Sequence, residues 1–124
     1  MPAGPATSDR LALVVEDNAR CAEIITAMLE ANGWLVDHAR DGFEAISRFR
    51  SHAYGALVLD YRLPGMDGHQ VLSWVRRNVP RTPEVVVISS ECRDFLHDRF
   101  RGMGVRAILP KPPAPADLIS ALAA

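Results

Sequence analysis

Short runs of consecutive apolar residues recur along this chain and alternate with segments of helical periodicity. The apolar runs occupy Leu11 to Val15, Ala56 to Asp60 and Val85 to Ser89, and the last two end in a polar residue. Runs of this length, apolar on both faces, are typical of strands buried inside a parallel sheet. Residues 34–39 instead alternate in polarity, which is typical of an edge strand. Val105 to Leu109 completes a set of five predicted strands.

Segments with helical periodicity separate these strands. Apolar stripes with spacings of three and four residues indicate amphipathic helices, the last of them short and beginning near Pro115. The stripes consist of Cys21, Ile24, Ile25, Met28 and Leu29; Phe43, Ile46 and Phe49; Val71, Leu72 and Val75; Phe95, Leu96, Phe100 and Met103; and Leu118, Ile119 and Leu122. Helix ends are expected at Asn32 and Gly33, near Ser51, at Asn78 and Pro80, and at Gly102 and Gly104.

This alternation predicts an α/β fold, a doubly wound (βα)5 unit whose five-stranded parallel sheet carries helices on both faces. The second strand alternates in polarity and is assigned to an edge, which favours the flavodoxin-like order 2-1-3-4-5. Ligands of such sheets bind beyond the carboxyl ends of the strands, which share one rim. Five polar residues end or follow strands one, three, four and five at this rim: Glu16, Asp17, Asp60, Ser89 and Lys111.

The predicted rim brings together groups suited to metal-dependent phosphoryl transfer. The carboxylates of Glu16, Asp17 and Asp60 repel one another unless a cation lies among them, and oxygen ligands favour Mg²⁺. Phosphoryl transfer needs a nucleophile and positive charge beside the phosphoryl oxygens. Asp60 is the candidate nucleophile, Lys111 a candidate positive charge beside the metal, and Ser89 a candidate hydrogen-bond donor. We therefore predict that Asp60 accepts a phosphoryl group.

Composition limits the other possibilities. At 124 residues, 48% of them hydrophobic, the chain suits one domain; we assign residues 10–124 to it and residues 1–9 to a flexible leader. A net charge of −1 predicts no direct contact with nucleic acid, and no apolar run approaches the roughly 20 residues that cross a membrane. We expect a cytoplasmic protein with reduced thiols at Cys21 and Cys92. The four histidines share no metal-binding spacing.

Four motifs resemble, in order and spacing, those of the receiver domain of two-component response regulators. They are VVEDN at residues 14–18, LVLD followed by LPGMDG within residues 57–68, VVISS at residues 86–90, and LPKP at residues 109–112. The resemblance extends from about Arg10 to Leu122. It implies a phosphorylation-dependent signalling switch in which a histidine kinase or histidine phosphotransfer protein phosphorylates Asp60. It implies no enzymatic turnover beyond the gain and loss of that phosphoryl group.

The resemblance also implies roles for single residues. Asp17 is expected to bind Mg²⁺ directly, Glu16 to assist through water, and the backbone carbonyl of Arg62 to supply a further ligand. Lys111 is expected to contact the phosphate, and Ser89 to provide the switch hydroxyl.

Some positions depart from the pattern of this family. Ile108 stands where the fifth strand usually carries a switching aromatic residue, so we expect a readout that uses no aromatic rotamer. Pro113 replaces another usual aromatic residue, and Pro110 precedes the lysine, which predicts a stiff connection. The bond between Lys111 and Pro112 is expected to be cis, which is uncommon but not costly for an X-Pro bond.

Two further residues occupy positions that border the path of attacking water in this family. Arg62 lies two residues beyond Asp60, and Glu91 two beyond Ser89. We predict that Arg62 and Glu91 pair across the site and slow the loss of the phosphoryl group. The alternative is two separate solvated side chains, since exposed ion pairs are weak. The fourth helix, fifth strand and fifth helix form the common partner surface of the family, which makes a dimer or output contact possible there.

Other functions remain open at this stage. A phosphatase of the haloacid dehalogenase type also uses a strand-end aspartate with Mg²⁺, but its second aspartate is replaced here by Arg62. A flavodoxin-like cofactor binder needs a phosphate-binding loop after the first strand, where Glu16 and Asp17 would repel a phosphate. Within the receiver interpretation, a stand-alone regulator and a domain of a hybrid kinase or larger regulator both remain possible.

Overall fold

The computed structural model describes residues 10–122, and the predicted leader at residues 1–9 lies outside them. Five parallel strands form one sheet in the order β2-β1-β3-β4-β5, as predicted. The strands are β1 (Leu11–Val15), β2 (Leu35–Ala39), β3 (Ala56–Asp60), β4 (Glu84–Ser89) and β5 (Val105–Pro110). The alternating strand β2 lies at one edge and pairs only with β1, whereas the apolar strands β1 and β3 lie inside the sheet.

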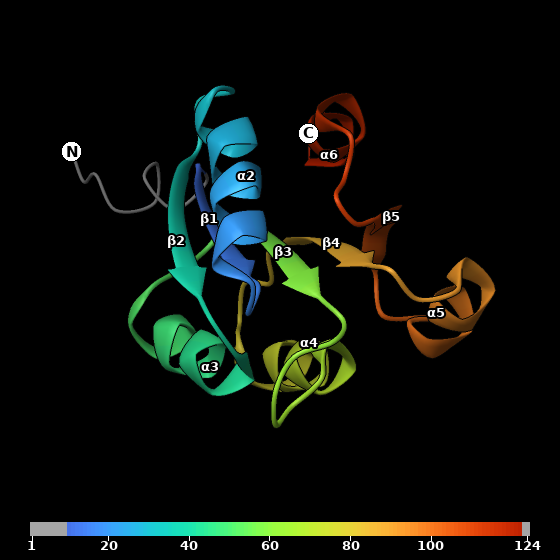
Figure 1. Ribbon diagram of the computed structural model, residues 1–124. Coiled ribbons are helices and arrows are strands. Elements are labelled where there is room, and N and C mark those ends of the chain that lie inside the picture. Colours follow the sequence, from blue (N-terminus) through green and yellow to red (C-terminus); the bar gives the residue numbers. More distant parts are fainter. Residues whose placement is uncertain (1–9, 123–124) are drawn as a thin grey trace.

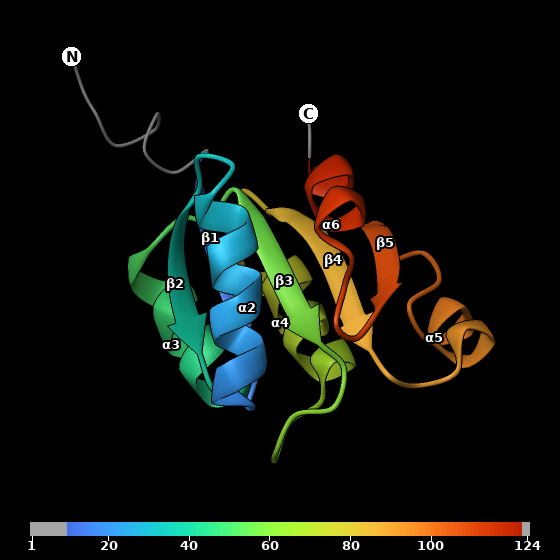
Figure 2. The same ribbon diagram turned by 45° about the horizontal axis from the view of Figure 1, so that its top comes forward.

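Five helices cover the two faces of the sheet. They are α2 (Ala19–Glu30), α3 (Gly42–Ser51), α4 (Gly68–Asn78), α5 (Arg93–Arg99) and α6 (Pro115–Leu122). Helices α2 and α6 lie on one face, and α3, α4 and α5 belong to the other (Figures 1 and 2). All strands point the same way, so their carboxyl ends meet at one rim (Figure 2).

The core has two apolar layers separated by the sheet. On the α2 face, Val14 and Val58 pack with Ile25 and Leu29 of α2 and with Leu118 of α6. The opposite layer joins the alternate strand positions to α3, α4 and α5 and contains Leu13, Leu57, Leu59, Leu72 and Leu96, all almost completely buried. Each fully buried side chain of this size stabilises the fold by about 1.5–3 kcal/mol before opposing terms are counted.

Side-chain caps turn the chain from a strand into the helix that follows it. Asn18 accepts a hydrogen bond from the backbone N–H of Cys21 at 2.9 Å, and Asp41 accepts one from Glu44 at 2.8 Å. Asp67 and Gln70 form a reciprocal capping box at the start of α4. Such caps satisfy amides that the first turn of a helix leaves unpaired. They fix the loops that carry the residues of the rim.

Two aromatic residues of the predicted apolar stripes are exposed. Phe43 has 60% of its surface exposed and Phe95 45%. A step of three residues turns a helix by about 300°, so a strict three-residue spacing drifts away from the buried face. Phe43 instead lies over the β3–α4 loop, where a Cβ on Gly65 would lie 3.0 Å from its ring.

Helix α5 is shorter than its predicted stripe. It ends at Arg99, and Phe100 and Met103 lie beyond it. Asp94 in the first turn and His97 and Arg99 in the last turn suit the dipole of a helix that spans Arg93–Arg99, although Cys92 provides no side-chain cap. Gly102 and Gly104 adopt positive φ angles in the turn that follows, as their predicted role in closing the helix requires.

The cysteines, the tryptophans and the lengths of the helices complete the description of the fold. Cys21 and Cys92 are free thiols. Trp34 packs in the core, with the guanidinium of Arg10 4.6 Å from its ring, and Trp74 packs against the opposite layer. No helix within residues 10–122 combines the length and apolar character needed to cross a bilayer.

Candidate functional site

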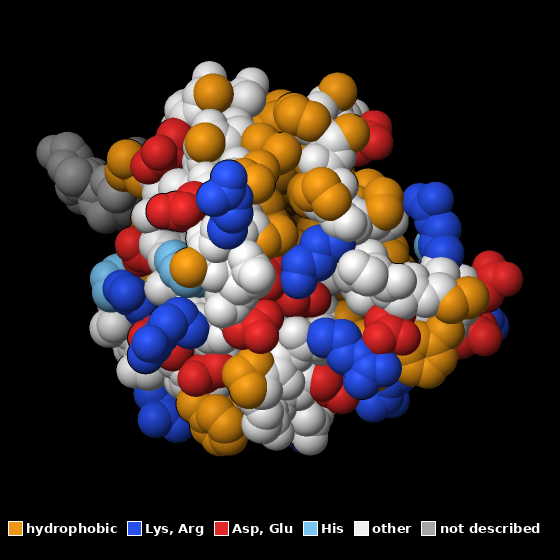
Figure 3. Space-filling model, viewed as in Figure 1, with side chains coloured by type: hydrophobic (Ala, Val, Ile, Leu, Met, Phe, Trp, Pro, Cys, Tyr) orange, Lys and Arg blue, Asp and Glu red, His pale blue; other side chains and the backbone are white. Residues whose placement is uncertain are grey.

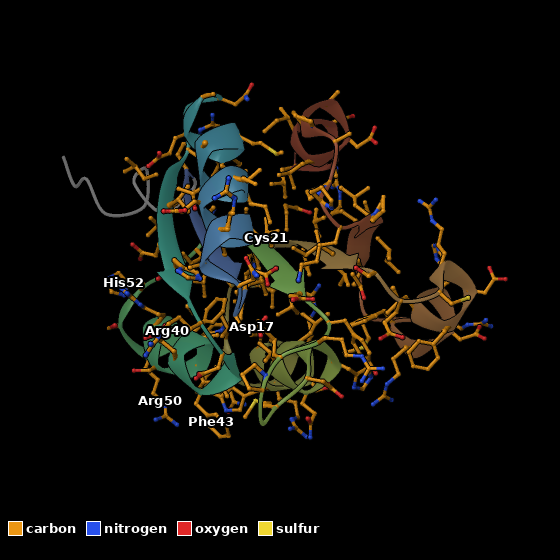
Figure 4. All side chains as sticks on the ribbon, in the orientation of Figure 1. Asp17, Cys21, Arg40, Phe43, Arg50 and His52 are labelled. Atoms are coloured by element: carbon orange, nitrogen blue, oxygen red, sulfur yellow. The ribbon has the colours of Figure 1, made fainter. Side chains whose placement is uncertain are left out.

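The five rim residues predicted from the sequence lie at the carboxyl ends of the strands. Asp60 and Ser89 are the last residues of β3 and β4, Glu16 and Asp17 follow β1, and Lys111 follows β5. Three of these side chains are buried, with exposed fractions of 0% for Glu16, 1% for Asp60 and 3% for Ser89. Figure 4 labels the exposed Asp17 at this rim, and Figure 3 shows acidic and basic side chains meeting near the middle of the same face.

Lys111 connects two of the carboxylates. Its Nζ donates to Asp60 Oδ2 at 2.8 Å and to Glu16 Oε2 at 2.9 Å. A lysine shared between two buried carboxylates lies where it can also contact a group added to either of them. The peptide bond from Lys111 to Pro112 is cis, as predicted, and Pro113 is buried beside it.

The three carboxylates form a set that fits a divalent cation. One oxygen from each of Glu16, Asp17 and Asp60 lies within 4.8 Å of the other two. Glu16 Oε2 accepts hydrogen bonds from Lys111 and from the backbone N–H of Asn18. Glu16 Oε1 is buried and has no hydrogen-bond partner among residues 10–122. A buried carboxylate oxygen without a partner is costly unless another group satisfies it. The donor set is all oxygen, which suits Mg²⁺.

Burial and neighbouring charges shift the pKa values of Asp60 and Glu16 in opposite directions. Burial raises the pKa of Asp60 to about 6, and the nearby charge of Glu16 adds to this, despite the opposing bond from Lys111. Burial also acts to raise the pKa of Glu16, but the bonds from Lys111 and Asn18 outweigh it and hold that pKa below its usual value. Burial acts to lower the pKa of Lys111, but its hydrogen bonds to Asp60 and Glu16 outweigh this and raise that pKa. One ammonium faces two carboxylates and Asp17, which leaves an excess of negative charge.

The loops after β3 and β4 meet at the mouth of the site. The backbone N–H of Arg62 donates to Asp60 Oδ1 at 3.2 Å, and the N–H of Glu91 donates to Ser89 Oγ at 3.0 Å. The side chains of Arg62 and Glu91 form an ion pair through Nε and Oε2. The guanidinium of Arg62 also lies 5.8 Å from the ring of Tyr61. This pair joins the loops after β3 and β4 beside Asp60 and Ser89.

Gly68 allows the loop after Asp60 to fold back onto the strand. Its backbone N–H donates to the Tyr61 carbonyl at 2.8 Å. A Cβ at this position would lie 2.6 Å from the Asp60 carbonyl oxygen and 2.9 Å from the Cα of Tyr61, both backbone atoms. A side chain cannot be accommodated there without moving the end of β3.

A cavity adjoins the site behind Ser89. It has a volume of about 320 Å³ and lies between the β4–α5 loop and β5, with Glu91, Arg93, Leu96 and Ile108 in its lining. Ile108 is buried, and its carbonyl accepts a hydrogen bond from Arg93 Nη2 at 3.2 Å. The cavity marks the space next to the position where the family usually has an aromatic residue.

Sequence reasoning missed one contact of the loop after β1, which carries Glu16 and Asp17. His38 Nε2 lies 2.7 Å from the backbone carbonyl of Glu16. The four histidines share no metal-binding spacing in the sequence, so none of them was singled out. The alternating polarity of β2 likewise could not show that His38 bonds to the loop after β1. The structure brings no histidine into the acidic cluster within residues 10–122. Cys21 lies in the first turn of α2 (Figure 4), and burial, together with the charge of Glu16, raises its pKa to about 11.

Comparison with known proteins places this arrangement in a family. The family model for the response regulator receiver domain matches residues 12–123. The transcriptional regulatory protein HprR of Escherichia coli K12 is 36% identical over 110 residues, covering 87% of this chain and 48% of HprR. The transcriptional regulatory protein TrcR of Mycobacterium tuberculosis H37Rv is 33% identical over 112 residues, covering 89% of this chain and 42% of TrcR. The chain spans about half the length of the curated relatives it matches.

Solved structures give the same result. A sensor protein from Polaromonas sp. JS666 superposes with a TM-score of 0.82 at 29% identity, covering 90% of this chain and 91% of that one. The signal receiver domain of a histidine kinase from Syntrophus aciditrophicus superposes with a TM-score of 0.80 at 26% identity, covering 90% and 86%. The sheet order, the acidic cluster and these matches agree, and the chain belongs to the receiver domain family of two-component response regulators.

Proposed function

We propose that this domain is the phosphorylation-dependent switch of a two-component phosphorelay and that Asp60 is its phosphoacceptor. The observation that supports this most is the position of Lys111, whose Nζ bonds to both Asp60 Oδ2 and Glu16 Oε2. A cation held at the strand-end carboxylate, next to a carboxylate oxygen that lacks a partner, suits a site that receives a phosphoryl group.

The reaction that we propose is an in-line transfer from a phosphohistidine of a kinase or phosphotransfer protein. A carboxylate oxygen of Asp60 attacks phosphorus, a P–O bond forms and the P–N bond breaks. The bonding electrons go to the histidine nitrogen of the donor. Lys111 then contacts the phosphoryl oxygens, which moves its positive charge from the carboxylates to the new group. Hydrolysis returns Asp60 and releases inorganic phosphate, so the domain turns over no separate substrate.

The metal of this site is Mg²⁺ in our proposal. Its ligands are the carboxylates of Asp17 and Asp60 and the backbone carbonyl of Arg62, with Glu16 assisting through water. When bound, the ion supplies positive charge that offsets the charge of the phosphoryl oxygens. The excess negative charge of the acidic cluster and the unpartnered Glu16 Oε1 support this assignment.

Ser89 is the switch hydroxyl in this proposal. Its Oγ accepts a hydrogen bond from the N–H of Glu91, and we propose that it turns to donate to a phosphoryl oxygen after transfer. Ile108 adjoins the cavity behind it, so the response of the neighbouring elements uses an aliphatic side chain where the family usually has an aromatic one.

Arg62 and Glu91 are modulators of the phosphoryl lifetime in the same proposal. Their ion pair joins the loops that follow Asp60 and Ser89, and both residues occupy positions that border the path of attacking water in this family. Pairing holds both side chains over this path. We propose that it slows hydrolysis.

Partners and context follow from the same function. The phosphohistidine belongs to the donor, a histidine kinase or a histidine phosphotransfer protein. The surface of α5, β5 and α6 is the proposed contact for a dimer or an output partner. Phe95 is exposed on α5 and supports such a contact. The curated relatives are about twice as long, which supports an output segment beyond this domain. A stand-alone regulator and a receiver in a hybrid kinase are the alternatives. We place this function in the cytoplasm.

Intact-mass measurement tests the proposal. The protein is incubated with acetyl phosphate and Mg²⁺, beside Asp60→Ala and a sample with EDTA. We expect one phosphoryl adduct on the parent and none on the variant or in EDTA. An adduct of equal yield on Asp60→Ala would refute Asp60 as the acceptor.

A further inference from the structure

We propose that His38 is a positioning residue of the metal site. Its imidazole holds the main chain at Glu16 so that the carboxylates of Glu16 and Asp17 are arranged for a divalent cation before it binds. This inference rests on the proposed function, because it concerns the Mg²⁺ site of the phosphoacceptor.

The peptide groups of Glu16 are held by the edge strand on both sides. Its N–H donates to the Ala39 carbonyl at 3.0 Å, and its carbonyl accepts from His38 Nε2 at 2.7 Å. A carbonyl oxygen can only accept, so the hydrogen of the neutral ring resides on Nε2. Within the described residues, no backbone amide donates to the Glu16 carbonyl. His38 therefore supplies the only bond to this carbonyl in that part of the chain.

The imidazole takes the place of the next bond in the strand ladder. Strand β2 ends at Ala39, where the chain turns toward α3. The N–H of Arg40 donates to Glu44 Oε1 at 2.7 Å, and Asp41 caps α3. The backbone of β2 thus separates from β1 at Glu16, where the loop after β1 begins. The His38 side chain reaches across at this point and extends the contact between the two segments to the Glu16 carbonyl.

The position of the Glu16 backbone affects the orientation of its carboxylate. Glu16 is completely buried, and its Oε2 is fixed by Asn18 and Lys111, so the direction of Oε1 depends on where the main chain lies. Asp17 follows directly, so a shift of the Glu16 peptide moves both carboxylates. Groups that orient metal ligands in this way change metal affinity by about tenfold or more when they are removed.

Isothermal titration with Mg²⁺ tests the inference on the whole chain. His38→Ala removes the donor, and we expect it to weaken Mg²⁺ binding about tenfold. His38→Gln keeps an N–H donor on a side chain of similar reach, and we expect it to restore most of the affinity. His52→Ala is the matched control, because His52 bonds to the Arg48 carbonyl at the outer end of α3, away from the rim (Figure 4).

Two further measurements separate the possible failures. Asp17→Asn tests the metal site itself: if it loses binding while His38→Ala matches the parent within twofold, the role of His38 is overturned and the proposed function stands. If the parent binds no Mg²⁺, both are overturned. If His38→Ala does not fold, NMR of the His38 imidazole in the parent tests the proposal instead. We expect a hydrogen on Nε2 that is protected from exchange and a change in the chemical shifts of the ring on addition of Mg²⁺. A ring protonated only on Nδ1 would overturn the proposal.

Discussion

Lys111 Nζ donates to Asp60 Oδ2 at 2.8 Å, and the two residues are 51 positions apart in the chain. Lys111 is the only lysine of the sequence; the other 13 basic side chains are arginines. Its compact ammonium can serve two carboxylates at once, whereas a planar guanidinium favours one partner in a forked geometry. The bond therefore joins the end of β5 to Asp60, the proposed acceptor, at the end of β3.

Removal of this ammonium should impair phosphoryl transfer. We expect Lys111→Met to lower the initial rate of phosphorylation by acetyl phosphate about 100-fold, because a positive charge aimed at the phosphoryl oxygens is lost. The rate is measured by intact mass over time at saturating Mg²⁺. Arg77→Met is the control, since it removes an exposed cation from the last turn of α4. Equal rates for Lys111→Met and the parent would contradict the role of Lys111.

The acceptor carboxyl should make the metal-free protein sensitive to pH. The pKa of Asp60, about 6 in the folded chain, lies above its ordinary value of 3.8, so the folded state binds this proton more tightly than the unfolded state. Stability from this group is present below about pH 4 and is lost as the pH rises through about 6. Asp60→Asn mimics the protonated acid, so we expect it to match the parent near pH 4.

At pH 7 the same variant should be more stable than the metal-free parent by about 2–3 kcal/mol, the size of a shift of two pKa units. Urea unfolding in EDTA across this pH range measures the difference. Saturating Mg²⁺ should reduce it, because the cation stabilises the ionised form. A difference between parent and variant that does not change between pH 4 and pH 7 would contradict the raised pKa.

Gly68 should tolerate no side chain. Gly68→Ala places a Cβ 2.6 Å from the Asp60 carbonyl oxygen, and we expect a loss of about 2–4 kcal/mol in unfolding free energy together with slower phosphorylation. Gly102→Ala is the control, because Gly102 has a φ of +77° but nothing within 4 Å of the added atom; its cost should be about 1 kcal/mol. If Gly68→Ala and Gly102→Ala lost the same unfolding free energy in urea, the contact between the new Cβ and the Asp60 carbonyl would not disturb β3, which would contradict this prediction.

The ion pair at the mouth should prolong the phosphorylated state. We expect Arg62→Asn to shorten the phosphoryl lifetime several-fold, and Glu91→Gln to do the same, since either change opens the path for water. The double variant should decay no faster than either single one, because the two residues act as a pair. The phosphoryl lifetime is measured by intact mass, as the rate at which the adduct disappears after acetyl phosphate is removed. A lifetime of Arg62→Asn equal to that of the parent would end this part of the proposal.

Much of the fold follows from the apolar pattern of the chain. The continuous runs of β1, β3 and β4 can be satisfied only inside a sheet, and parallel strands bring their carboxyl ends to one rim. The convergence of Asp60, Ser89 and Lys111 could therefore be predicted without coordinates. The resemblance of the motifs supplied the cis bond before Pro112, which no periodicity indicates.

Other features depend on contacts between distant segments. Phe43 carries an apolar signal, but its position on the helix turns it toward the loop at Gly65. The bond from His38 to Glu16 depends on where the edge strand ends, at Ala39, and on the cap of α3 that follows. The unpartnered oxygen of Glu16 likewise appears only once burial and the position of Lys111 are known.

Site mapping tests the central claim most directly. An acyl phosphate reacts with borohydride, which reduces the phosphorylated aspartate to homoserine, and peptide mass spectrometry then locates the change. After treatment with acetyl phosphate and Mg²⁺, we predict homoserine at position 60 in the parent and no conversion without Mg²⁺. Conversion at another carboxylate with Asp60 intact, or an adduct that yields no homoserine, would contradict the assignment of Asp60 as the phosphoacceptor.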